Sequence, residues 1–157
     1  MQNTQLQGPP LAASERVSWR RLPFIALMAA LLAAAANALV YLASSGLGFI
    51  PESVRISTPG GEQALGLAPV VASSAGGVIA AALVFALIGV FARRPVRLFR
   101  VVATVALALS FAMPLTISGA PLAMVLSLEA MHVVAWASAV GLLTTLARRP
   151  RRAGGSG

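Results

Sequence analysis

Residues 67–117 read LAPVVASSAGGVIAAALVFALIGVFARRPVRLFRVVATVALALSFAMPLTI, two long apolar runs joined by a short basic stretch. The runs cover 67–92 and 98–117. An α-helix rises ~1.5 Å per residue, so each run is long enough to cross ~30 Å of hydrocarbon. Lipid offers the backbone no hydrogen-bond partners, and a spanning run must therefore be helical. This stretch predicts two membrane-spanning helices that meet on their basic side.

Two more apolar runs, 23–43 and 121–147, lie on either side of this pair. None of the runs carries the polar stripe of a helix in a soluble bundle, so lipid rather than water is expected around them. We predict an all-α membrane protein with four transmembrane helices in one compact domain, 22–149. Pro114 is expected to kink the third helix, because proline removes a backbone hydrogen bond.

The remaining segments are predicted to connect or flank the helices. Residues 44–66 are rich in Gly and Pro and are predicted to form a structured outer loop, with a short strand or turn around 54–56. Residues 1–21 are predicted to be a disordered tail and residues 150–157 a flexible one.

The composition excludes several classes of protein. Hydrophobic residues make up 58% of the chain and charged residues only 10%, with a mean hydropathy of +0.85. A soluble domain carries about a quarter charged residues, so an ordinary soluble enzyme is excluded. The chain has no Cys, which excludes disulfides, thiolate catalysis and Cys-ligated metals.

The twelve basic residues are all arginines, and eleven of them fall on one side of the predicted membrane. Only Arg55, beside Glu52 and Glu62, falls on the other side. The positive-inside rule makes the basic side cytoplasmic, which places both termini inside, in a bacterial inner membrane. The net charge of +8 therefore reflects orientation rather than a nucleic-acid partner. The eleven are Arg16, Arg20, Arg21, Arg93, Arg94, Arg97, Arg100, Arg148, Arg149, Arg151 and Arg152.

Glu129 and His132 are the ionisable residues expected deep within a span, where such groups are costly and point to function. They are three residues apart and share a helix face. Asn37, Ser74 and Ser110 are expected in the same outer half of the membrane. These five residues form the candidate intramembrane polar site, either an outward-facing pocket or a hydrogen-bonded core.

Two interpretations of this site stay open. In the structural one, polar side chains join the helices, with Glu129 donating a hydrogen bond to Asn37 or to a backbone carbonyl. In the functional one, Glu129 and His132 bind a ligand or a proton. Glu-x-x-His is half of a di-iron motif, but a single intramembrane acid cannot complete it, and zinc hydrolysis needs three protein ligands. No catalytic residue, metal or cofactor is expected.

The order of several short motifs resembles a family of small bacterial four-helix membrane proteins known as domain of unknown function 6069. The resemblance covers residues 23–149. It implies the same four-helix fold and leaves the function open. The motifs are Asn37-Ala-Leu-Val-Tyr41, Pro59-Gly60-Gly61, Arg93-Arg94-Pro95-Val96-Arg97 leading into Phe99-Arg100, Ser110 with Pro114-Leu115, and Met131-His132-Val133-Val134-Ala135.

The sequence thus predicts a small, non-enzymatic integral membrane protein. A structural or accessory subunit that binds a partner, either another membrane protein or a second copy, is the first hypothesis. The alternative is a small transporter or ligand-binding protein that uses an outward-facing polar pocket at Glu129 and His132. The expected surroundings are the lipid bilayer, and no nucleic acid is expected.

Overall fold

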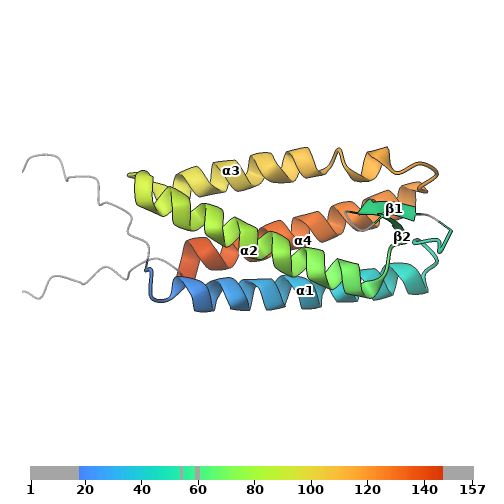
Figure 1. Ribbon diagram of the computed structural model, residues 1–157, viewed down its shortest axis with the longest axis horizontal. Helices are drawn as coiled ribbons and strands as arrows, with labels where there is room; N and C mark the ends of the chain where they lie inside the picture. The colour runs from blue at the N-terminus through green and yellow to red at the C-terminus, as the bar shows by residue number, and fades with distance from the viewer. Residues whose placement is uncertain (1–17, 54, 59–60, 147–157) are drawn as a thin grey trace, which may run out of the picture.

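The computed structural model describes residues 18–53, 55–58 and 61–146, which contain four long helices and one β-hairpin (Figure 1). All four are long and apolar enough to cross a membrane, the third as the segment Pro95–Thr116. The helices are α1 (Leu22–Gly46), α2 (Leu67–Phe91), α3 (Pro95–Ser110) and α4 (Leu122–Leu146), and a 3₁₀ turn, η1 (Pro114–Thr116), follows α3.

The third helix differs from the expectation of a kinked helix over 98–117. It begins earlier, at Pro95, because a proline in the first turn gives up an N–H that has no helical partner. It ends at Ser110, and the chain continues through tighter turns into η1 at Pro114. Proline cannot donate the next helical bond and disfavours helical backbone in the residue before it, so Pro114 ends the helix rather than kinking it.

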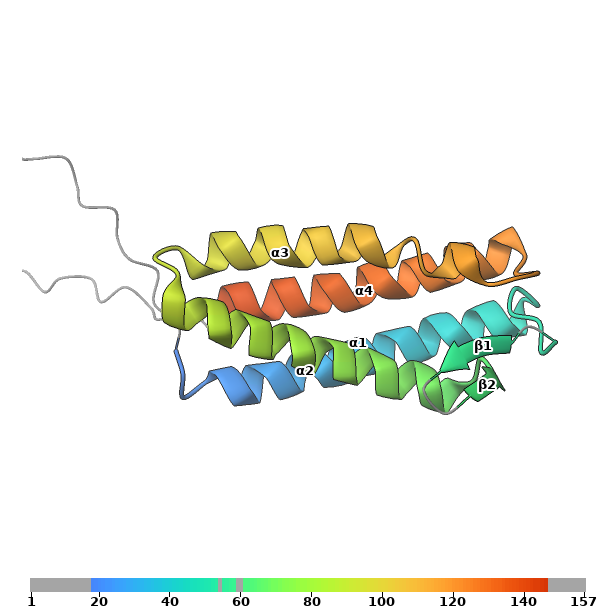
Figure 2. The same ribbon diagram turned by 45° about the horizontal axis from the view of Figure 1, so that its top comes forward.

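The four helices form a bundle in which α3 is the peripheral member (Figures 1 and 2). Helix α1 packs closely along α2 and α4, whereas α3 packs less extensively on α2 and α4. The buried residues of α3 all lie in its first two turns: Pro95, Val96 and Phe99. The centroids of the Phe99 and Phe85 rings lie 4.9 Å apart, and this contact fixes the start of α3 against α2.

The core consists of two apolar clusters that follow one another along the bundle. One lies toward the α2–α3 connection and includes Phe85, Phe99 and Leu143. The other, near the hairpin, is built on Ile50, Val70, Met124 and Met131. Small residues permit close helix approach in lipid, and the fully buried Ala29 and Ala33 provide this on α1.

The segment between α1 and α2 contains a hairpin, where the sequence predicted a structured loop with a short strand or turn. Strands β1 (Arg55–Thr58) and β2 (Gly61–Ala64) pair antiparallel, with Arg55 opposite Ala64. Gly61 has a φ of 107°, a conformation that favours glycine. Tyr41 Oη donates a hydrogen bond to the Leu65 carbonyl oxygen at 3.2 Å and thereby ties the end of the hairpin to α1.

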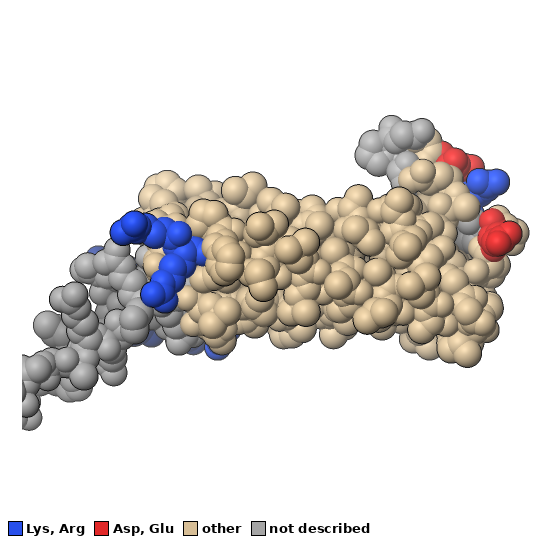
Figure 3. Space-filling model, turned by 90° about the horizontal axis from the view of Figure 1, so that it is seen from below, with Lys and Arg blue, Asp and Glu red and all other residues tan. Residues whose placement is uncertain are grey.

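The charged side chains gather at the two ends of the bundle and leave its middle uncharged on the face shown in Figure 3. The start of α1 and the end of α4 lie at the same end of the bundle (Figure 1). Residues 18–21 of the predicted tail form a turn, whereas 1–17 and 150–157 lie outside the described residues, as do Arg16, Arg148, Arg149, Arg151 and Arg152.

The buried alanines of α1 predict that a larger side chain lowers the stability of the protein at a buried position but not at an exposed one. Ala33→Leu should lower stability by about 1–3 kcal/mol, because a leucine at this fully buried position forces α2 and α4 apart. Ala35→Leu lies two residues away on the exposed face and should be nearly neutral. Thermal unfolding in detergent compares the two, and equal losses would contradict the packing described above.

Candidate functional site

Asn37 is the polar centre of the helix packing. Its Nδ2 donates one hydrogen bond to Ser74 Oγ at 2.8 Å and another to the Met131 carbonyl oxygen at 3.0 Å. The first bond joins α1 to α2, and the second joins α1 to α4. Both N–H groups of the amide are therefore used to hold three helices together.

The Asn37 bridge lies at the boundary between the two apolar clusters. On α1 the cluster residues Leu22 to Ala33 precede Asn37, and Val40 and Tyr41 of the other cluster follow it. Lipid-exposed helices gain nothing from burying apolar surface against each other, so such bonds and close packing hold the bundle. The bridge sets the register of α1 against α2 and α4.

Glu129 and His132 share a face of α4 but do not bond to each other. His132 Nδ1 donates to the Leu128 carbonyl oxygen of its own helix at 2.7 Å. Glu129 Oε2 is enclosed and has no hydrogen-bond partner among the described residues. The expected bond from Glu129 to Asn37 is not formed: Asn37 Oδ1, the atom that would accept it, has no hydrogen-bond partner among the described residues.

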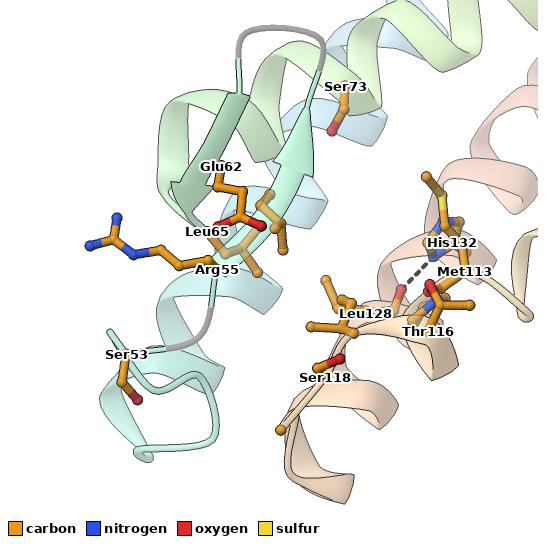
Figure 4. Close-up of a pocket in the computed structure, with 14 residues that line it drawn as sticks. Ser53, Arg55, Glu62, Leu65, Ser73, Met113, Thr116, Ser118, Leu128 and His132 are labelled. Carbon is orange, nitrogen blue, oxygen red and sulfur yellow. Dashed lines mark hydrogen bonds between the residues drawn. The ribbon is translucent and has the colours of Figure 1, made fainter.

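A cleft of about 770 Å³ opens between the hairpin and the segment that joins α3 to α4 (Figure 4). This volume lies within the roughly 300–1,000 Å³ typical of small-molecule sites. We call it the outer cleft, and its residues come from both sides of the opening, from α2 and from α4. They are Ser53, Arg55, Ile56, Glu62, Leu65, Ser73, Met113, Pro114, Thr116, Ile117, Ser118, Gly119, Leu128 and His132.

The lining of the outer cleft is partly polar. Figure 4 shows Met113 and Thr116 beside His132 on one side, with Glu62 across the opening and Arg55 directed away from His132. The Nδ1–H of His132 is engaged by a carbonyl, which leaves Nε2 as the free ring nitrogen, a hydrogen-bond acceptor when the ring is uncharged. The cleft can therefore bind a molecule that carries hydroxyl or N–H donors.

A second, smaller cavity of about 230 Å³ lies between α2, α3 and α4. We call it the helix groove. His132 lines both cavities, and Trp136, one turn further along α4, has an enclosed Nε1 without a hydrogen-bond partner among the described residues. The groove is lined by Gly77, Val78, Ala81, Ala103, Ala106, Leu107, Ser110, His132, Ala135, Trp136 and Ala139.

The five residues of the predicted site thus occupy three places. Asn37 and Ser74 bond to each other, His132 and Ser110 line the helix groove, and Glu129 lines neither of the two cavities. Ser110 Oγ donates to the Leu107 carbonyl oxygen of its own helix at 2.7 Å. The prediction placed all five in one half of the membrane but did not resolve these separate environments.

Sequence reasoning missed the contribution of the hairpin to the cleft. Ser53 and Glu62 line it, although neither belonged to the candidate site. Their only sequence signal was the Gly- and Pro-rich character of 44–66, which indicated an ordered connection but not its position over α4. Among the described residues, no group of three His, Cys, Asp or Glu side chains could hold a metal ion.

Comparison with known proteins gives one match. A family model with the description "Family of unknown function (DUF6069)" matches residues 17–153. No curated protein matches the chain, and no solved structure does.

The Asn37 bridge predicts a graded loss of stability. Asn37→Asp keeps the side-chain size but removes both N–H donors, so it should cost more than Ser74→Ala, which removes one bond. Each bond between membrane helices contributes about 0.6–2 kcal/mol. Ser73→Ala is the control, because Ser73 Oγ donates to the Val70 carbonyl oxygen within α2. Unfolding in detergent should rank the Asn37→Asp variant as the least stable of the three. A loss in Ser73→Ala as large as that in Asn37→Asp would contradict the bridge.

Proposed function

The chain belongs to the DUF6069 family, whose function is unknown, and we propose that it is a non-enzymatic membrane protein that binds a small molecule in the outer cleft. One observation carries this proposal: the cleft extends from the hairpin to His132, a residue within a membrane-spanning helix. Polar side chains on the wall of such a cavity can orient a ligand, while its apolar lining supplies contact area.

The state of His132 favours binding over a purely structural role. A closed Glu129–His132 hydrogen bond would have satisfied both groups within the protein. Instead, His132 bonds to its own backbone, and its ring lines the cleft. An intramembrane imidazole that faces a cavity is a candidate ligand contact.

The accessory-subunit hypothesis needs one helix face that differs from lipid-facing surface. Large exposed apolar side chains occur on every helix, including Leu31, Leu83, Leu109 and Leu126. Contact with lipid requires such residues all round the bundle. They do not single out a face for a partner, so ligand binding has the stronger support.

We further propose that the protein lies in a bacterial inner membrane with both termini in the cytoplasm. The described arginines at one end support this, since basic residues concentrate on the cytoplasmic side. They are Arg20, Arg21, Arg93, Arg94, Arg97 and Arg100, whereas Arg55 belongs to the outer hairpin. In this orientation the cleft opens on the outer side of the membrane.

This orientation predicts which residues a reagent reaches in intact cells. The chain has no Cys, so single cysteines can be introduced without a background. A membrane-impermeant maleimide should label Glu52→Cys in intact cells and Arg93→Cys only after permeabilisation. If the reagent labelled Arg93→Cys but not Glu52→Cys in intact cells, the protein would have the opposite topology and the proposal would be wrong.

Ligand binding predicts a molecule that co-purifies with the protein. In mild detergent the wild-type chain should retain a small molecule that mass spectrometry detects after extraction. Thr116→Trp should lose it, because the indole occupies the part of the cleft beside His132, whereas Leu115→Trp should keep it, because Leu115 is exposed and does not line the cleft. Purification without any bound molecule, or equal retention by both variants, would overturn the proposal.

A further inference from the structure

We infer that the ligand is a lipid-like amphiphile, with its polar headgroup in the outer cleft beside His132 and its hydrocarbon chain in the helix groove. This inference rests on the proposed function and adds the chemical class of the ligand. It depends on the position of His132 on the wall of both cavities, on the apolar character of the groove, and on the hydrogen-bonding atom that His132 offers.

Both cavities border on His132. Of the described residues, it is the one that lines both the outer cleft and the helix groove. The cleft side carries hydroxyls and a carboxylate, including Thr116, Ser118 and Glu62. The groove side is largely apolar and lies among helices long enough to span the membrane. A molecule that occupies both must therefore be polar at one end and apolar at the other.

The groove lies along the part of α3 that has no buried residue. Phe99 packs on Phe85, and Arg100 Nη2 donates to the fully buried Thr144 Oγ1 at 3.1 Å. Beyond these contacts every residue of α3 is half-buried or exposed. Small side chains such as Ala103 and Ala106 face the gap and leave it unfilled. A hydrocarbon chain fits such a groove, because lipid tails match the polarity of its walls.

His132 marks the headgroup region, because it borders on both cavities. When its ring is uncharged, Nε2 is a hydrogen-bond acceptor, and a headgroup hydroxyl would donate to it. Trp136 lines the groove but not the cleft, so its ring would contact the hydrocarbon chain. A lipid with a free hydroxyl close to its chain carries both features. A helix from a second copy would fill the groove but would not occupy the polar cleft.

The experiment uses Trp136 as the reporter. In the full chain with Trp19→Phe, Trp136 is the single remaining tryptophan. The probe is a monoacylglycerol with a brominated chain, which quenches indole fluorescence on contact. Titration in detergent should give saturable quenching that unbrominated monoacylglycerol reverses. Added to this background, Gly77→Leu fills the groove and should raise the half-saturating concentration about tenfold or more, since it displaces several methylene groups of the chain.

Adjacent glycines provide a matched control. A Cβ at Gly76 or at Gly77 meets nothing within 4 Å, so neither substitution is expected to disturb the backbone. Of these two glycines only Gly77 lines the groove. The brominated lipid should therefore quench Trp136 in the Gly76→Leu variant at the same half-saturating concentration as in the parent protein. Ala106→Phe and Ala108→Phe form a second pair on α3, where Ala106 lines the groove and Ala108 is exposed beside it.

The outcomes separate this inference from the proposed function. Unchanged quenching in both Gly77→Leu and Ala106→Phe would overturn the placement of the chain. A co-purified molecule that lacks a hydrocarbon chain, and that Thr116→Trp removes, would overturn the amphiphile but leave the proposed function standing. If Gly77→Leu converts a dimer into a monomer without affecting quenching, the groove is an interface between copies, and the inference is wrong.

Discussion

The Asn37 amide is the interaction on which the arrangement of the other helices depends. Lipid provides no hydrophobic force that drives one apolar helix onto another, so specific hydrogen bonds and close packing must select the arrangement. Asn37 supplies two such bonds, to Ser74 on α2 and to the backbone of α4 at Met131. Buried alanines on the same helix allow the close approach that these bonds require. Together they make α1, α2 and α4 a tightly packed unit.

Helix α3 packs on the bundle mainly through its first turns, and both cavities lie next to the rest of it or the segment that follows. Its first turns are fixed by Phe99 against Phe85 and by Arg100 at Thr144, whereas its remainder has no buried residue. Termination at Ser110, ahead of Pro114, then sends the chain through an irregular segment instead of a final helical turn. That segment forms one wall of the outer cleft, and the loosely packed part of α3 forms one wall of the helix groove.

The candidate site illustrates how far helical spacing can be taken. Glu129 and His132 are three residues apart, and the spacing correctly predicts a shared helix face. It does not predict side-chain partners, because a histidine can bond either to a neighbouring side chain or to the carbonyl four residues before it. His132 Nδ1 bonds to the Leu128 carbonyl oxygen. Asn37 is equally ambiguous in sequence: nothing in its neighbours indicates that Ser74 and Met131 would accept its two N–H groups.

The sequence by itself determined the number of apolar runs long enough to span a membrane and the separation of most arginines from Glu52 and Glu62 along the chain. Both follow from the polarity of individual residues, which needs no knowledge of their neighbours in space. The family match over residues 17–153 confirms the resemblance to the family. Only the tertiary structure decided that the hairpin stands across a cleft from the α3–α4 connection, and that His132 faces two cavities while Glu129 lines neither. These properties depend on distances between segments far apart in the chain, which hydrophobic pattern does not encode because lipid-facing helices look alike on all sides.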